Sequence, residues 1–188
     1  ALGSIPAEFQ PVYQFYLSCI EQQTREAIDI AGSQGGHIDS NYIPGSEYAP
    51  FSSQLNFLGF PVPYWYYVSG NGLIKEQVPT ESEIERDIGN YIQDNLADCD
   101  FSEYYQKGLY VKVAEPSVKV EVEDNKVNVG VNSEVVVSQE GKSSRKTEHK
   151  IEVNSNLGKF YNEALEIYNK QKNEAGLDHD STDVLRLY

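Results

Sequence analysis

The sequence predicts an α+β domain in which N-terminal helices and a C-terminal helix pack on an antiparallel β-meander. Three stretches carry apolar residues at helical spacing, and the stretch between the second and the third alternates apolar and polar residues with a period of two. Helices segregated in sequence from an antiparallel sheet are typical of this class. The chain of 188 residues is long enough for one core, so we expect residues 1–188 to form a single domain.

A first amphipathic helix is predicted from about residue 7 to residue 31. Its apolar positions recur every three or four residues. They are Val12, Tyr16, Cys19, Ile20, Ala27 and Ile30. Gly32, Gly35 and Gly36 then end the helix, because glycine adopts the positive φ that turns a chain sharply.

From residue 37 to residue 72 helical periodicity disappears, while aromatic residues, prolines and glycines accumulate. Proline excludes a long helix, so we expect an aromatic-rich long loop with a short strand across residues 63–69. Loops of this length are either packed by their own side chains or functional. Four consecutive aromatic residues lie in it: Tyr64, Trp65, Tyr66 and Tyr67. These rings either brace the core or form a candidate binding surface for a sugar or a protein.

The clearest helix start in the chain lies at Thr80. Glu83 follows it by three residues, which is the spacing of a capping box, and Glu81 adds a favourable charge in the first turn. A second helix is therefore predicted from about residue 81 to residue 97. Its buried stripe comprises Ile84, Ile88, Tyr91, Ile92 and Leu96.

Short runs with a period of two follow between residues 109 and 153. Valines on one side alternate with lysines and glutamates on the other, which predicts an antiparallel sheet with one face in water. The runs are 109–113, 118–122, 127–131, 135–137 and 151–153. Asp124 and Asn125 suit a two-residue hairpin turn, whereas residues 139–145 are expected to form a mobile polar connection. We place His149 on the outward face of the last strand.

A third helix is predicted from about residue 155 to residue 173, capped by Asn154 or Ser155 and ended by Gly176. Its apolar face comprises Leu157, Phe160, Tyr161, Ala164, Leu165 and Tyr168. An acidic tail, residues 176–188, follows. It ends in a small apolar patch that is a candidate assembly contact: Val184, Leu185, Leu187 and Tyr188.

Cys19 and Cys99 are the two cysteines of the chain, and neither lies in a CxxC or metal-ligand pattern. They are either two buried thiols of a cytosolic protein or one disulfide. We favour the disulfide, because each cysteine lies at the edge of a helical segment and the tyrosine-rich, methionine-free composition suits an oxidising compartment. In the chain-entropy account, closing the loop between them stabilises the fold by about 4 kcal/mol.

The charge balance excludes two classes of partner. The chain holds 29 Asp and Glu residues against 15 Lys and Arg residues, a formal net charge of −14. Such a surface repels phosphate backbones and anionic lipid headgroups, so neither nucleic acid nor a peripheral membrane surface is expected to bind. The chain begins Ala-Leu-Gly-Ser without methionine, so we expect a processed product or a fragment. A membrane would be reached only through a missing N-terminal anchor.

No catalytic, metal or cofactor site is predicted. The three histidines, His37, His149 and His179, lie outside HxxxH or HExxH spacing, and no GxSxG motif accompanies them. In Asp178-His179-Asp180 the ligand types stand on adjacent positions, which rarely converge on one ion. We therefore expect a protein that is not an enzyme and that carries no cofactor.

Several short motifs resemble an uncharacterised family of archaeal proteins. They are Pro6-Ala7-Glu8-Phe9-Gln10-Pro11-Val12, Ser18-Cys19-Ile20, Gln34-Gly35-Gly36-His37-Ile38, the second cysteine after the helix that starts Pro-Thr-Glu-Ser-Glu-Ile-Glu, and Leu157-Gly158-Lys159-Phe160-Tyr161. Members of that family look like ectodomains behind one N-terminal membrane helix, with no established activity. The resemblance implies an extracellular or cell-surface location and leaves the activity open.

Two functions from different classes are consistent with these observations. The first is a non-enzymatic cell-surface or secreted ectodomain with a structural or protein-interaction role, in which a protein partner or self-association builds a surface assembly or filament. The alternative is a carbohydrate or small-ligand binding module that uses the aromatic residues between positions 42 and 67. The alternative requires at least two of the rings of residues 64–67 to be exposed around a concavity.

Overall fold

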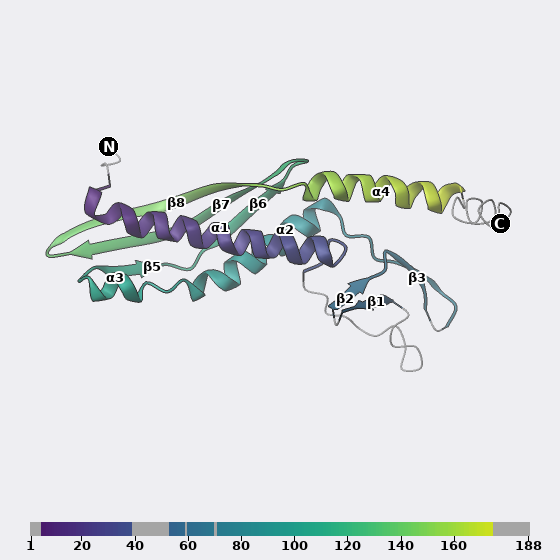
Figure 1. The fold of residues 1–188 in the computed structure, drawn as a ribbon, viewed down its shortest axis with the longest axis horizontal. Helices are drawn as coiled ribbons and strands as arrows, with labels where there is room; N and C mark the ends of the chain where they lie inside the picture. Colours follow the sequence, from purple (N-terminus) through teal and green to yellow (C-terminus); the bar gives the residue numbers. More distant parts are fainter. Residues whose placement is uncertain (1–4, 39–52, 59, 70, 175–188) are drawn as a thin grey trace.

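A computed structural model describes residues 5–38, 53–58, 60–69 and 71–174 and confirms the α+β class. A short 3₁₀ turn, Ala7–Phe9, leads into the first helix, and helices and strands then alternate in blocks along the chain (Figure 1). The helices are α1 (Gln10–Ser33), α2 (Glu81–Asn95), α3 (Ser102–Gln106) and α4 (Leu157–Glu174). The strands are β1 (Gln54–Phe57), β2 (Phe60–Pro63), β3 (Tyr66–Val68), β4 (Ile74–Glu76), β5 (Tyr110–Val113), β6 (Ser117–Val122), β7 (Lys126–Gln139) and β8 (Lys142–Asn154).

Strand β7 is the centre of the main sheet, and all of its pairings are antiparallel. Strand β8 runs along one side of it for almost its whole length. On the other side, β6 pairs with the first half of β7 and β5 with the second half. The expected meander is present from β6 to β8, while β5 lies beyond the end of β6 on the same side of β7.

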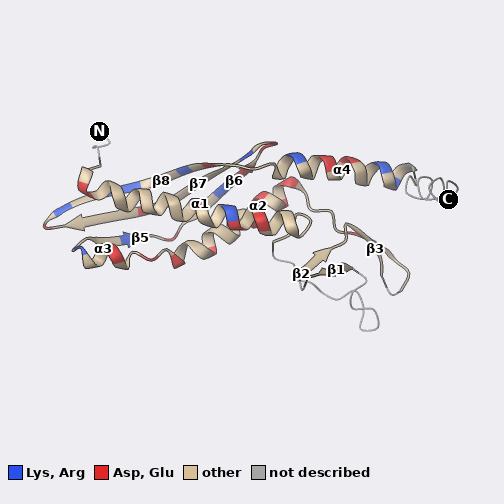
Figure 2. Ribbon diagram, in the orientation of Figure 1, with Lys and Arg blue, Asp and Glu red and all other residues tan. Residues whose placement is uncertain are grey.

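One face of this sheet is apolar and is covered by α1 and α2, which also pack against each other (Figure 1). The odd-numbered residues of β7 from Val127 to Val137 are all buried there. They meet the buried stripes of the two helices, which comprise Val12, Tyr16, Ile20 and Ala27 on α1 and Ile84, Ile88 and Ile92 on α2. The opposite face carries charged side chains and is open to water (Figure 2), as the alternation predicted.

Two expectations for the end of the sheet are wrong. The connection predicted over residues 139–145 is only the two-residue turn Glu140–Gly141, whose φ values of 51° and 81° are those of a tight hairpin turn. The polar residues on either side of this turn belong to β7 and β8, because the outer face of the sheet is in contact with water. His149 is buried rather than outward, since a period of two puts it on the same face as Ile151 and Val153.

The second helix begins as predicted. The Glu83 backbone N–H donates to the Thr80 hydroxyl at 3.2 Å, and the Thr80 backbone N–H donates to the Glu83 carboxylate at 2.8 Å. These two bonds satisfy donors that the first turn of a helix leaves free. The helix ends at Asn95, and a 3₁₀ turn over Leu96–Asp98 replaces its predicted last residues. The short helix α3 was not predicted.

The described part of the aromatic-rich segment is not an irregular loop. It forms two small antiparallel hairpins, β1 with β2 and β3 with β4, and β3 lies inside the stretch where a short strand was expected. Strand β2 accommodates Pro61 and Pro63, because each of its residues pairs on one side only. Residues 39–52 of the predicted loop lie outside the described residues.

Helix α4 begins where predicted, with the Leu157 N–H donating to the Ser155 hydroxyl at 3.1 Å. Its first turn rests on the β6–β7 turn, where the Lys159 N–H donates to the Asp124 carbonyl oxygen at 3.3 Å. From there α4 runs past the end of the sheet along the long axis of the molecule (Figure 1), so most of its length does not cover the valine face. The acidic tail, residues 176–188, lies outside the described residues.

The contact at Gly158 sets the position of α4, and Gly158→Ala tests it. A methyl group there would meet the Glu123 carbonyl oxygen at 2.5 Å and the Asp124 nitrogen at 3.2 Å, both backbone atoms. We expect the variant to lose about 1–3 kcal/mol of unfolding free energy, despite the higher helix propensity of alanine. Gly130→Ala is the control, since its methyl group would meet only the Lys119 carbonyl oxygen at 4.0 Å. Equal stability of Gly158→Ala and the wild type in urea unfolding would contradict this account.

Candidate functional site

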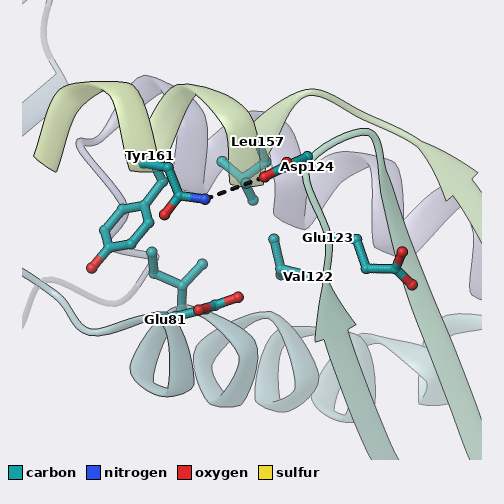
Figure 3. Close-up of a pocket in the computed structure, with 9 residues that line it drawn as sticks. Glu81, Val122, Glu123, Asp124, Leu157 and Tyr161 are labelled. Carbon is teal, nitrogen blue, oxygen red and sulfur yellow. Dashed lines mark hydrogen bonds between the residues drawn. The ribbon is translucent and has the colours of Figure 1, made fainter. Parts of the chain in front are cut away.

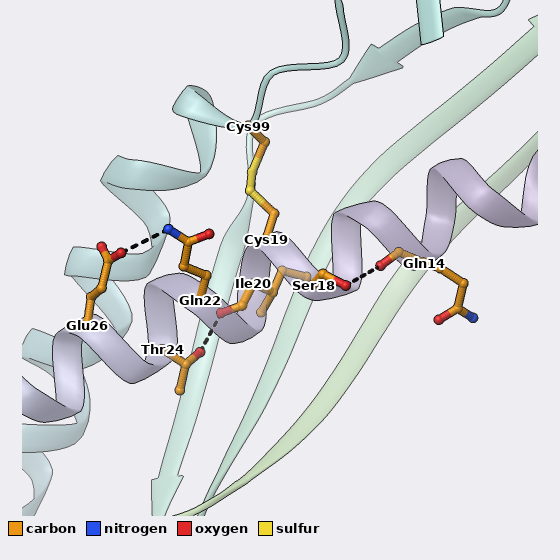
Figure 4. The surroundings of a disulfide bond; sticks show 8 residues. All are labelled: Gln14, Ser18, Cys19, Ile20, Gln22, Thr24, Glu26 and Cys99. Atoms are coloured by element: carbon orange, nitrogen blue, oxygen red, sulfur yellow. Dashed lines mark hydrogen bonds between the residues drawn. A yellow bond between two sulfur atoms is a disulfide. The ribbon is translucent and has the colours of Figure 1, made fainter. Parts of the chain in front are cut away.

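The predicted disulfide is confirmed and joins the two core helices (Figure 4). Cys19 lies in the middle of α1, and Cys99 follows the 3₁₀ turn at the end of α2. Their Cα atoms are 6.2 Å apart, and 80 positions separate them in sequence. Cys99 is buried, so the bridge is part of the packing between the helices rather than a surface feature. A disulfide is consistent with an oxidising setting.

A cleft of about 520 Å³ lies beside this bridge, between the end of α2, α3 and β5. Its floor is apolar and buried: Leu96, Cys99, Phe101 and Val111. Asp94 and Glu115 also line it and are exposed. The cleft has room for an apolar group.

A polar cluster lies inside the core next to this cleft. The His149 Nε2 atom is 3.1 Å from the Ser133 carbonyl oxygen, and its ring meets the Tyr16 ring edge-on with centroids 4.8 Å apart. All three residues are almost fully buried, and the Tyr16 hydroxyl and His149 Nδ1 have no partner at hydrogen-bonding geometry. Burial lowers the pKa of His149 and raises that of Tyr16. His149 is therefore neutral at pH 7.

The described histidines bond to backbone carbonyl groups rather than to catalytic partners. His37 Nε2 is 3.0 Å from the Gln77 carbonyl oxygen, which ties the end of α1 to the segment before α2. Within the described residues no three His, Cys, Asp or Glu side chains gather in a way that would hold a metal ion. None of the described helices has the length and apolarity needed to cross a bilayer. His179 lies outside the described residues.

A smaller cavity, of about 130 Å³, lies where α2, the β6–β7 turn and α4 meet (Figure 3). Glu81 points into it from the start of α2, and Asn162 Nδ2 donates to the Asp124 carboxylate at 3.2 Å across its edge. Tyr161 lines the side formed by α4 and donates its hydroxyl to the Pro79 carbonyl oxygen at 2.7 Å. These bonds fasten α4 to the body, so we assign this cavity a structural role.

The outer face of the sheet holds a shallow hollow of about 520 Å³ over Gly130. Lys119 and Lys150 are the direct cross-strand neighbours of Gly130 on either side. In the next row, Glu121 and Glu152 flank Asn128 in the same way. Positive and negative side chains thus lie close together, which suits a solvated sheet face.

The aromatic run of residues 64–67 divides between packing and exposure. Trp65 packs: its indole N–H donates to the Gly35 carbonyl oxygen at 2.8 Å, and its ring meets Tyr161 and Tyr168 of α4 with centroids 6.0 Å and 5.8 Å away. Tyr64 and Tyr66 are exposed, while Tyr67 is half-buried. None of the three cavities above is lined by these four rings. Their role as a sugar-binding surface stays a prediction.

Exposed apolar side chains gather at one end of the molecule, on the two small hairpins and α4. We call this the hairpin–α4 end, comprising the described residues of 53–76 and 157–174. It holds ten of the twelve large apolar or aromatic side chains that are exposed among the described residues; the other two are Tyr105 and Tyr110. The ten are Leu55, Phe57, Leu58, Tyr64, Tyr66, Val68, Leu73, Ile74, Phe160 and Ile167. Phe160 and Ile167 belong to α4 and the other eight to the hairpin region, so this end has the highest concentration of exposed apolar side chains among the described residues. Such concentrations mark interaction surfaces, whereas isolated exposed apolar residues do not.

The β3–β4 hairpin and the Trp65 segment before it are in contact with α4. The Lys172 ammonium forms an ion pair with the Glu76 carboxylate at 2.8 Å, and this bond lowers the pKa of Glu76 and raises that of Lys172. Trp65 lies between the hairpins and α4 and contacts both Tyr161 and Tyr168. The exposed apolar side chains are therefore held on packed elements.

No protein-family model, curated protein or solved structure matches the chain. The resemblance to an archaeal ectodomain family accordingly stays a prediction, as does the single-domain organisation.

Sequence reasoning missed two features of these sites. The apolar face of α4 is predicted, but not that part of it is exposed, because the spacing of apolar residues does not say which side of a helix is covered. The buried histidine was missed through an error in the strand register, although its spacing from Val153 was visible in the sequence. The predicted assembly contact, Val184, Leu185, Leu187 and Tyr188, lies outside the described residues.

Removing the disulfide tests its contribution to stability. The variant Cys19→Ala/Cys99→Ala is expected to lose about 4 kcal/mol of unfolding free energy, because the unfolded chain regains the entropy of an open loop. Urea unfolding of the variant and of the reduced wild type should give matching midpoints, both well below that of the oxidised protein. A double variant as stable as the oxidised protein would overturn this assignment.

Burial of His149 predicts a loss of stability on acidification. Because its folded-state pKa lies below the ordinary 6.5, the unfolded chain takes up the proton first, and stability falls as the pH drops below 6.5. The slope is at most about 1.4 kcal/mol per pH unit. The pKa of Glu83 is lowered by its hydrogen bonds with Thr80, so its stabilising effect is lost only below 4.5.

His149→Phe separates the pH range in which His149 takes up a proton from that of Glu83, because it removes only the first of these groups. The phenylalanine ring keeps an aromatic contact with Tyr16. We expect the loss of unfolding free energy between pH 7 and pH 5 to be smaller in this variant than in the wild type. The control is His37→Gln, which removes a half-buried histidine and should keep that loss. Slopes are compared rather than absolute stabilities, since either substitution changes the latter. An unchanged slope in His149→Phe would rule out His149 as the titrating group.

Proposed function

We propose that this chain is a non-enzymatic cell-surface or secreted domain that binds a protein partner through its hairpin–α4 end. The observation that carries the proposal is the concentration of ten exposed large apolar side chains at this end. Aromatic and aliphatic side chains clustered on a packed surface are the usual anchors of protein interfaces.

The disulfide supports the location outside the cytoplasm. Structural disulfides persist in oxidising compartments and are rare in the cytosol. The bridge between α1 and α2 joins two core elements and is buried on the Cys99 side, which is the arrangement of a structural bond rather than a transient redox site.

A protein partner is favoured over a sugar by the way the aromatic run is used. Sugar platforms present flat rings around a hollow, and Trp65, the largest ring in the run, packs instead against α4. Tyr64 and Tyr66 stay exposed, but they stand among aliphatic neighbours such as Val68 and Ile74. A mixed aromatic and aliphatic surface suits the apolar core of a protein interface.

Site-specific photocrosslinking in the native cells tests this proposal. A benzophenone side chain placed at Phe57 or at Ile74 should give protein adducts of higher mass, because both positions lie in the proposed interface. The matched control is Tyr110, which has an exposed fraction of 66% but lies outside the hairpin–α4 end. Adducts at the control position in equal yield, or none at Phe57 and Ile74, would contradict the proposal.

A further inference from the structure

One face of α4 is apolar and open to solvent. It is formed by Phe160, Ala164 and Ile167, which we call the α4 stripe, with exposed fractions of 62% for Phe160 and 57% for Ile167. The face directed at the β3–β4 hairpin is a different one and carries Tyr161, Tyr168 and Lys172. The body of the protein thus occupies one side of α4 and leaves the α4 stripe open.

The spacing of the α4 stripe is that of a helix–helix seam. Counting from the buried Leu157, the positions 157, 160, 164, 167 and 171 alternate steps of three and four residues. This is the spacing of the core positions in a coiled coil, where a second helix lies along the seam. Because α4 projects beyond the sheet (Figure 1), a second helix has access to the seam along most of its length.

We infer that α4 pairs with α4 of a second copy of this chain, in antiparallel orientation. This inference rests on the proposed function and names the partner. A two-fold axis between Ala164 and Ile167 places each Ala164 against Ile167 of the second copy, and each Phe160 against the other end of the stripe. The apolar side chains of the stripe then cover one another.

Charge complementarity fixes this occupant and this orientation. Glu163 and Lys170 flank the α4 stripe on the same side, seven residues or two turns apart. In the antiparallel pair, each Glu163 lies within about 3 Å along the axis of Lys170 of the second copy, so two symmetric ion pairs form. Among the described residues Lys170 makes no ion pair, and Glu163 has only a contact of 3.9 Å with Lys159. In a parallel pair the same charges would not meet.

The contact is small and the association weak. An 18-residue helix is about 27 Å long, and three apolar side chains per copy bury less than a stable dimer needs. The net charge of −14 on each copy also opposes association. Anchoring of both copies on one surface raises their effective concentration and populates the pair.

Charge reversal tests the pairing by sedimentation velocity, up to about 1 mM protein, where a contact of millimolar Kd is visible. The wild type should form dimers. Glu163→Lys and Lys170→Glu should each lose them, because each places like charges opposite one another. An equimolar mixture of the two variants, and the doubly reversed chain, should regain them. Ile167→Ser should also be monomeric. Because Ile167 is exposed, this substitution is not expected to disturb folding.

Glu166→Lys is the matched control. It changes the net charge by the same amount as Glu163→Lys but lies about 130° around α4 from the centre of the stripe, outside the seam, so its dimers should persist. A wild type that stays monomeric at 1 mM, or dimers indifferent to all these substitutions, would overturn the pairing. In that outcome the crosslinks at Phe57 and Ile74 still decide, separately, whether the hairpin–α4 end binds a different protein.

Discussion

Strand β7 pairs with all three of the other strands in its sheet, so the apolar face on which both core helices pack is built around it. The odd-numbered side chains from Val127 to Val137 are buried along its whole length. Each buried branched side chain removes apolar area from water, which is the largest stabilising contribution to folding. Because β5 and β6 bind the same side of β7 in succession, one continuous strand holds both of them in the sheet.

The disulfide and the buried polar cluster act on the same part of the core. Cys19 and the neighbouring Ile20 bring α1 close to the end of α2, while Tyr16, one turn earlier, meets His149 on β8. The register of β7 against β8 shifts between Asn132 and Val135, and Ser133 lies in that shift. Its carbonyl oxygen faces His149, and its hydroxyl donates to the Ala114 carbonyl oxygen at 2.6 Å. The irregular strand segment is thus stabilised by hydrogen bonds that a regular ladder would not provide.

The parts of the fold that could be predicted are those in which local chemistry and burial agree. The capping box at Thr80 and the valine alternation of β6 and β7 combine a backbone requirement with one buried face, and both are observed. Of the hairpins of residues 54–76, only the strand across residues 63–69 is predicted. The other strands are three or four residues long and mostly exposed, which leaves no alternation to recognise. The exposed face of α4 is invisible for a related reason: periodicity identifies an apolar stripe without identifying what covers it.

The distribution of charge favours the proposed association at the hairpin–α4 end. Strand β8 is the longest edge of the main sheet, since among the described strands it pairs only with β7. Lys142, Arg145 and Lys150 are exposed along it, and so are Glu148 and Glu152. Charged side chains on an edge strand, lysine above all, oppose strand-to-strand pairing. On α4 the charges beside the stripe, Glu163 and Lys170, have opposite signs, so in the proposed antiparallel pair they attract each other.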